Sequence, residues 1–184
     1  MKKLLLPMMM VATMFACQSP ETKTAEKADA SVDKQTGTFT SLDEKSAKVK
    51  QLLEAYMNND STQIYAHYAD TVKVYDQMAN HQEGGKTVPN PGGKAGFAAN
   101  ERANHAYFSD IKITTDNIKT FVFADGRVHS GVWAMWSGKG KYTNQSITVP
   151  VHLVFIWEGD KVVREYRFFD PTTLYAEVAA SQKK

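Results

Sequence analysis

The chain has 184 residues, of which 42% are hydrophobic and 23% charged, so it can form one ordinary domain with a sizeable core and still carry shorter extra segments. Its formal net charge is +2, and Lys2 and Lys3 account for this excess. Because nucleic-acid-binding domains usually carry a basic excess or a basic stripe, no nucleic acid is expected as a partner.

Residues 1–16 have the pattern of a secretory signal peptide: Lys2 and Lys3 precede an apolar run that is too short for a stable transmembrane helix. The ending Met14-Phe15-Ala16-Cys17 resembles the lipobox of bacterial lipoproteins. This resemblance implies lipidation at Cys17, a lipid bilayer as partner, and an exported, membrane-anchored protein in the periplasm or at the cell surface. The alternative is an ordinary signal peptide followed by an incidental cysteine. Cys17 is the only cysteine, so no disulfide within the chain is expected.

Residues 17–41 are expected to form the lipidated cysteine and a flexible tether. The segment after Cys17 is polar and charged, with few large apolar side chains. Such a segment cannot bury enough surface to offset the entropy lost on ordering. The folded domain is therefore expected over residues 42–184.

Three helices are predicted in the first half of this domain. Ser41 and Glu44 form a capping-box pair, which predicts a helix beginning near Leu42. Asp60 with Gln63 predicts a second, shorter helix, and residues 94–107 a third. A strand is expected over residues 72–76, and the glycine- and proline-rich segment 77–93 is expected to be a loop or a flap over a cavity. The apolar stripe of the first helix is expected to be Val49, Leu52, Leu53, Tyr56 and Met57.

The second half of the chain is predicted to be mainly antiparallel sheet. Three strands, beginning at Ile111 and over residues 118–123 and 128–136, are followed by a hairpin over residues 148–170, and a short helix is expected over 172–180. In the first strand of the hairpin, alternation places Phe155 on one apolar face and His152 on the other. In the second strand, the same period of two places Phe168 on the face of Val162 and Asp170.

Helices followed by a run of antiparallel strands indicate an α+β fold with helices on one face of a sheet. Residues 49–76 give a helix, Asn-Asn-Asp, a short helix, His-Tyr-Ala-Asp and a strand, and residues 158–170 read Glu-Gly-Asp-Lys-Val-Val-Arg-Glu-Tyr-Arg-Phe-Phe-Asp. Both segments resemble the nuclear-transport-factor-2-like (NTF2-like) superfamily, in particular its SnoaL-like branch. The resemblance implies a cone: a curved antiparallel sheet wrapped over N-terminal helices, with a pocket inside. Ketosteroid isomerases, polyketide cyclases and dehydratases share this superfamily, so the resemblance is more specific for fold than for function.

Asp76 is the first candidate for a catalytic residue. In the ketosteroid isomerase branch, an aspartate that follows a Tyr-Ala-Asp segment by six residues acts as the base, and Asp76 follows Tyr68-Ala69-Asp70 at that spacing. A carboxylate in an apolar pocket would have its pKa raised by desolvation, which suits a general base near neutral pH. The alternative is that Asp76 ends a strand and meets water at the rim.

Asp170 and His152 are the other catalytic candidates. In SnoaL-like cyclases an aspartate late in the sheet is the proposed base, and the resemblance implies that role for Asp170. The alternative is a turn residue before Pro171. His152 could shuttle a proton if it faces the pocket beside Asp170 or Asp76, whereas a histidine in a sheet is more often merely packed and hydrogen-bonded.

The candidates for the pocket wall are aromatic: Tyr56, Trp133, Phe155 and Phe168. Trp133 and Trp136 have opposite parity, so only one is expected to face the cavity and the other to cover the convex face. The superfamily commonly dimerises through that face, which implies a homodimer. The sequence has no His-x-His or Glu-x-x-His pattern, so no metal is predicted, and no cofactor is implied.

Three functions therefore remain open at the level of sequence. The first is a domain that binds a small, largely apolar molecule in its cone. The second is an enzyme of the isomerase, cyclase or dehydratase kind with an aspartate base. The third is a scaffold for protein association, whose cavity would be filled by its own aromatic side chains.

Overall fold

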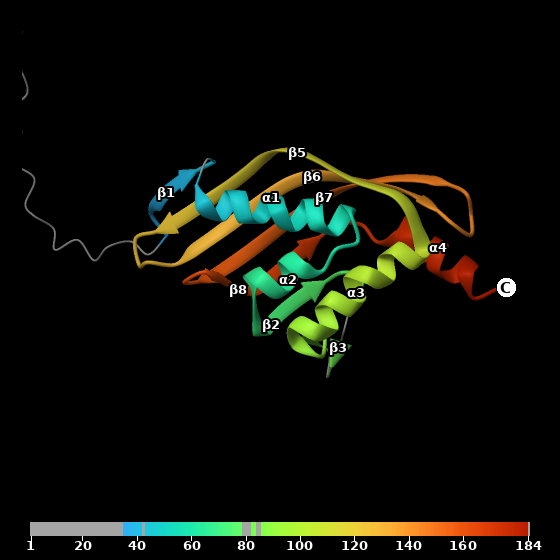
Figure 1. The fold of residues 1–184 in the computed structure, drawn as a ribbon, viewed down its shortest axis with the longest axis horizontal. Coiled ribbons are helices and arrows are strands. Elements are labelled where there is room, and N and C mark those ends of the chain that lie inside the picture. Colours follow the sequence, from blue (N-terminus) through green and yellow to red (C-terminus); the bar gives the residue numbers. More distant parts are fainter. Residues whose placement is uncertain (1–34, 42, 79–81, 84–85, 184) are drawn as a thin grey trace, which may run out of the picture. The chain divides into compact units, whose positions relative to one another are not determined.

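The computed structural model describes residues 35–41, 43–78, 82–83 and 86–183 (Figure 1). The predicted signal peptide and Cys17 lie outside the described residues. Within the described part of the chain, no helix combines the length and the hydrophobicity needed to cross a membrane.

The described residues form an α+β fold built on one curved six-stranded sheet, as the sequence predicts (Figure 1). The strand order is β1-β5-β6-β7-β8-β2, and all neighbours are antiparallel except β8 and β2, which are parallel. The strands are β1 (Gly37–Thr40), β2 (Tyr68–Asp76), β5 (Phe108–Phe123), β6 (Val128–Gly140), β7 (Ser146–Glu158) and β8 (Lys161–Phe168). Two short strands, β3 (Gln82–Glu83) and β4 (Lys86–Thr87), pair with each other in the segment predicted to be a loop or flap.

The helices are α1 (Glu44–Met57), α2 (Thr62–His67), α3 (Gly93–Tyr107) and α4 (Thr172–Ser181). The first three cover the concave face of the sheet (Figure 1). The N-cap of α1 is Asp43, whose side chain accepts a hydrogen bond from the Ser46 backbone N–H at 2.9 Å, so the capping box predicted at Ser41 does not form. The predicted apolar stripe packs against the sheet, with Val49, Leu52 and Leu53 buried.

β7 shows the alternation that the sequence predicts. Val149, Leu153 and Phe155 are buried on the inner face, where they meet side chains of α1 and α3, whereas His152 points to the outer face. The fold therefore has an apolar layer between sheet and helices, and a cavity lies in that layer.

β8 departs from a simple alternation because it contains a β-bulge. Ile156 of β7 pairs with Arg164, but the next residue, Trp157, pairs with Val162, so Val163 is an extra residue in β8. A bulge of this kind transfers every later side chain to the opposite face. Phe168 is therefore outside rather than inside, which corrects the prediction that it shares a face with Val162.

β1 lies within the segment predicted to be a tether. It pairs with β5 from Gly37 opposite Phe123 to Thr40 opposite Thr120, so the fold begins earlier than residue 42. Its four residues are all exposed, so no burial pattern in the sequence could indicate this edge strand.

Candidate functional site

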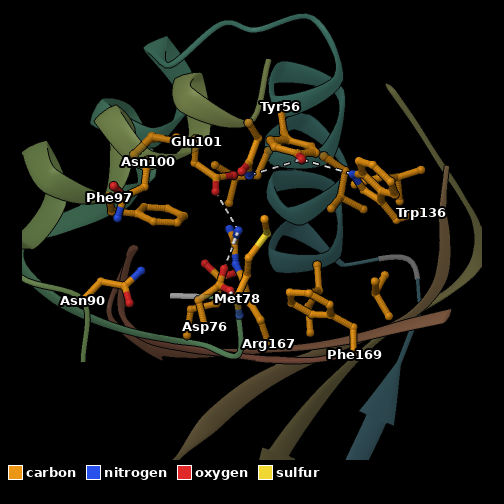
Figure 2. Close-up of a pocket in the computed structure, with 18 of the residues that line it drawn as sticks. Tyr56, Asp76, Met78, Asn90, Phe97, Asn100, Glu101, Trp136, Arg167 and Phe169 are labelled. Carbon is orange, nitrogen blue, oxygen red and sulfur yellow. Dashed lines mark hydrogen bonds and ion pairs between the residues drawn. The ribbon is translucent and has the colours of Figure 1, made fainter. Parts of the chain in front are cut away.

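A cavity of about 380 Å³ lies between the sheet and the helices (Figure 2). Most of its wall is apolar or aromatic, and the polar groups gather in a cluster around Arg167 and in a smaller group around Tyr56. The apolar wall includes Leu52, Leu53, Ile64, Phe97, Phe108, Ile113, Trp136, Val149, Val151, Leu153, Phe155, Phe169 and Leu174.

Arg167 of β8 is the centre of a buried ionic cluster. Its Nη1 donates to Glu101 Oε1 of α3 at 2.6 Å and lies 3.4 Å from Asp76 Oδ2 at the end of β2, and its Nε donates to Glu165 Oε1 at 2.7 Å. Figure 2 shows the guanidinium group between Glu101 and Asp76. Arg167 lies inside because the bulge turned it inward. We refer to these four residues as the Arg167 cluster.

The Arg167 cluster is almost closed to water, and this changes how its members hold protons. Burial raises the pKa of Glu101 above its ordinary value of 4.5, although the charge of Arg167 opposes that effect. Burial disfavours the charged form of Arg167, but the three carboxylates outweigh it and raise the pKa of Arg167 well above its ordinary range. The Tyr68 hydroxyl donates a hydrogen bond to Glu165 Oε2. Burial, together with the Glu165 charge, raises the pKa of Tyr68 well above 10.

A second polar group, at Tyr56, faces the same cavity. The Tyr56 hydroxyl oxygen accepts hydrogen bonds from Trp136 Nε1 at 3.1 Å and from Asn104 Nδ2 at 3.5 Å. These bonds leave the hydroxyl proton of Tyr56 available to a bound molecule. Burial, followed by the nearby charge of Glu101, raises the pKa of Tyr56 far above 10, so the group stays a neutral donor.

Asn90 supplies an acceptor that nothing in the described part of the chain satisfies. Its Oδ1 is buried in the cavity wall without a hydrogen-bond partner there, and the residue is only 8% exposed. Its backbone N–H donates to Val74 O at 2.7 Å, which fixes the residue beside β2. An unsatisfied buried amide oxygen is costly, so this position suits a ligand or a water molecule that donates a hydrogen bond.

No family model and no curated protein matches the sequence, but many solved structures share this architecture. An NTF2-like protein of unknown function from Burkholderia pseudomallei aligns with 16% identity and a TM-score of 0.56 over 72% of this chain and 95% of its own. A protein of Catenulispora acidiphila with a ketosteroid isomerase-like fold, solved in complex with trimethylamine, aligns with 14% identity and a TM-score of 0.55 over 72% and 92%. A SnoaL-like polyketide cyclase of Agrobacterium tumefaciens aligns with 12% identity and a TM-score of 0.51, over 71% of this chain and 94% of its own.

The chain has the NTF2-like fold. The resemblance seen in the sequence is thereby confirmed for the fold, and identities this low carry no more than the fold. In this NTF2-like unit the helices and the concave face of the sheet enclose the cavity, as the resemblance implies.

The structure does not bring the three predicted catalytic residues together. Asp76 lines the cavity, but both of its oxygens are engaged, Oδ1 by the Met78 N–H at 2.8 Å and Oδ2 by Arg167. Asp170 is exposed outside the cavity and accepts hydrogen bonds from the backbone and hydroxyl of Thr172 at the start of α4, which lower its pKa. His152 points outward and hydrogen-bonds Val132 O through Nδ1 at 2.9 Å. Asp76 therefore cannot act with either partner inside this cavity.

Two of the four predicted wall residues, Tyr56 and Phe155, line the cavity. Trp133 and Phe168 do not: they are 43% and 48% exposed on the convex face, on either side of the His152 ring at 4.7 and 6.0 Å between centroids. For Trp133 the reason is strand parity, since Trp136 is the tryptophan that faces inward. For Phe168 the reason is the bulge in β8.

Sequence reasoning missed the residues that dominate the polar part of the site. Glu101 follows Phe97 by four residues on α3, so the two share one helix face, and this spacing could have marked Glu101 as buried. Strict alternation from Val162 would place Glu165 and Arg167 on the opposite face, and the bulge at Val163 that brings them inside leaves no mark in the hydrophobic pattern.

Proposed function

We propose that this NTF2-like unit binds a small, largely apolar molecule in its cavity. The observation that carries the proposal is the cavity itself, about 380 Å³ with an apolar wall and a few convergent polar groups. Ligand sites of small molecules typically occupy about 300–1,000 Å³ and have this composition. The Tyr56 hydroxyl and Asn90 Oδ1 offer one donor and one acceptor to orient a guest.

Two further observations support binding over the scaffold alternative. A scaffold would fill the cone with its own aromatic side chains, yet open space remains between Phe97, Trp136 and Phe155. The protein of Catenulispora acidiphila with this fold was solved with a small molecule, trimethylamine.

The proposal is tested by following the indole N–H signals of the three tryptophans in a proton–nitrogen NMR spectrum while 1-adamantanol is added. Trp136 faces the cavity and Trp133 the convex face, so a guest in the cavity shifts the Trp136 signal in a saturable way and leaves Trp133 in place. Trp136→Phe and Trp133→Phe variants assign the two signals. Shifts confined to Trp133, or no shift for a range of apolar probes, would refute the proposal.

A second candidate function is proton transfer on a bound carbonyl compound, as in the isomerase, cyclase or dehydratase hypothesis. The observation that favours it is the pair of Tyr56, a neutral donor for a developing oxyanion, and Glu101, a cavity carboxyl with a raised pKa. Asp76 remains the aspartate available as a base, but its two carboxylate oxygens are already engaged by the Met78 N–H and by Arg167. A substrate proton would have to displace one of these donors.

Isomerisation of 3-cyclohexenone to the conjugated 2-cyclohexenone, followed by ultraviolet absorbance, tests this function. An enzyme of this kind accelerates the reaction above the buffer rate and loses at least about tenfold of that rate in Tyr56→Phe, as expected for an oxyanion donor. Asp76→Asn and Glu101→Gln then identify the base, with the exposed Asp170→Asn as a matched control. Activity that survives Tyr56→Phe would exclude the cavity as its source.

We also propose that Cys17 carries a lipid and anchors the exported protein to a membrane. The support is the signal-like segment 1–16 and the lipobox-like residues Met14 to Cys17. Metabolic labelling of expressing bacteria with an alkyne-tagged fatty acid tests the proposal. Label that is present in the wild type and absent in Cys17→Ser supports it, and equal label in both excludes lipidation at this residue.

A further inference from the structure

The charges in the cavity wall do not balance. Among the described lining residues, the acids Asp76, Glu101 and Glu165 face one cation, Arg167. Arg167 cancels one of these negative charges. The wall therefore carries net negative charge even when Glu101 holds a proton. A guest with a negative group adds to that imbalance, whereas a guest with a positive group reduces it.

The hydrogen-bonding capacity that remains open near the Arg167 cluster is mainly for donors. Within the described residues, Glu101 is engaged through Oε1 and leaves Oε2 unused, and Asn90 Oδ1 is buried with no donor. Asn90, Glu101 and Arg167 line the same cavity and are labelled in Figure 2. Arg167 is the charged donor among the described residues at this end, and three carboxylates already share it. A guest that brings its own N–H groups would satisfy what the protein leaves unsatisfied.

The wall near this space also suits a cation. The guanidinium carbon of Arg167 lies 4.7 Å from the centroid of the Phe97 ring, so a cation already rests against an aromatic face there. Burial raises the pKa of Glu101, which shows that its negative charge is poorly solvated. A positive group beside it would stabilise that charge.

We propose that the ligand of this cavity carries a protonated amine on an apolar body, with the ammonium group seated at Glu101 and Asn90. This inference rests on the proposed function, because it names the chemical class of the molecule that the cavity binds. Three carboxylates against one arginine, together with the unpartnered Asn90 oxygen, carry it. Within the described residues no trio of acidic, histidine or cysteine side chains is arranged to hold a metal ion, so an organic cation is the expected occupant.

Three compounds that share one apolar body and differ in charge test the inference: 1-adamantanamine, 1-adamantanol and 1-adamantanecarboxylate. Their dissociation constants for the purified full-length chain are measured by isothermal titration calorimetry at pH 7. The amine is expected to bind at least about tenfold more tightly than the carboxylate, because an ammonium group offsets the net negative charge of the wall and a carboxylate adds to it. It is also expected to bind more tightly than the alcohol, because its three N–H groups can donate to the acceptors that the wall leaves unsatisfied.

Two variants locate the ammonium group, and one controls for net charge. Glu101→Gln is expected to weaken the amine by about tenfold and to leave the alcohol within about twofold. Asn90→Leu is expected to weaken the amine about threefold or more, again without loss for the alcohol. Asp160→Asn removes the same charge at an exposed turn, outside the cavity lining, and is expected to change neither. Because Asn90 Oδ1 has no partner in the described structure, Asn90→Leu should stay folded even if Glu101→Gln does not.

The outcomes separate this inference from the proposed function. The inference is supported if the wild type prefers the amine, if Glu101→Gln and Asn90→Leu reduce that preference, and if Asp160→Asn keeps it. Equal binding of the amine and the alcohol, or tighter binding of the carboxylate, overturns it and leaves apolar binding in place. If none of the three compounds binds, and the Trp136 signal responds to no apolar probe, the proposed function falls and the inference falls with it.

Discussion

Arg167→Met removes the cation that holds the buried ionic cluster together. The Arg167 side chain is 13% exposed, and those of Glu101 and Glu165 are 9% and 0% exposed, so solvent cannot replace the lost charge. Removing one partner of a buried ion pair typically costs about 3–5 kcal/mol, and Arg167 serves three partners, so we expect the upper half of that range. For a domain of this size each kcal/mol lowers the melting temperature by about 2–4 °C, so the variant should melt about 8–20 °C below the wild type at pH 8.

The pH dependence of this loss follows from the sign of the Glu101 shift. Burial already raises the pKa of Glu101, and without Arg167 the opposing charge is gone, so the pKa rises further. A carboxyl group with a raised folded-state pKa binds more protons when folded, so stability falls as the pH rises from 4.5 through that pKa. The deficit of Arg167→Met should therefore be smaller at pH 5 than at pH 8.

Differential scanning calorimetry of wild type, Arg167→Met and Arg164→Met at both pH values measures these effects. Arg164 lies on the same strand but is exposed on the outer face, so Arg164→Met should change stability by no more than about 0.5 kcal/mol. The reasoning is wrong if Arg167→Met and Arg164→Met melt together at pH 8. It is also wrong if the deficit of Arg167→Met grows as the pH falls to 5.

Three further predictions concern a helix cap, a buried glutamate and the convex face of the sheet. Asp43→Ala should lower the free energy of unfolding by about 1–2 kcal/mol at pH 7, because the helix cap is lost. Burial raises the pKa of Asp43, but hydrogen bonds lower it below 3.8 overall, so the stability advantage of the wild type should vanish well below pH 3.8. An advantage that persists there would contradict this. Glu177→Ala should cost about 2–3 kcal/mol in urea unfolding, because buried Glu177 accepts two backbone N–H bonds and the Thr143 hydroxyl; a cost below about 0.5 kcal/mol would contradict this. If the convex face forms a homodimer, as the resemblance implies, Trp133→Asp should give a monomer in sedimentation equilibrium and Tyr65→Ser should not; a wild-type monomer would exclude the dimer.

The fold was predictable because its main signals are local and repeated. The alternation through Val149, Leu153 and Phe155 marked the inner face of β7, and the stripe through Val49, Leu52 and Leu53 marked the face of α1 that meets it. These patterns reflect burial, and burial is what selects helix and strand faces. The helix start was misplaced because Asp43, rather than Ser41, supplies the cap.

The site was less predictable because two of its determinants are not local. One inserted residue, Val163, reverses the faces of Arg167 and Phe168, and no apolar pattern announces it. Glu101 becomes a cavity residue because α3 packs on β2, the neighbour of β8, which brings Glu101 within reach of Arg167. Charged residues are rarely buried unless they are paired, so a sequence alone predicts that Arg167 and Glu101 are exposed.

Blocking the cavity tests the account most directly. Ala103 and Ala99 are both exposed residues of α3, but Ala103 also lines the cavity and Ala99 does not. Binding of 1-adamantanol and 1-adamantanamine is measured by calorimetry for wild type, Ala103→Trp and Ala99→Trp. We predict that Ala103→Trp weakens both compounds by at least about tenfold, since overpacking a pocket excludes its guest, and that Ala99→Trp binds as the wild type does. Equal binding by all three proteins would contradict the claim that this cavity is the binding site.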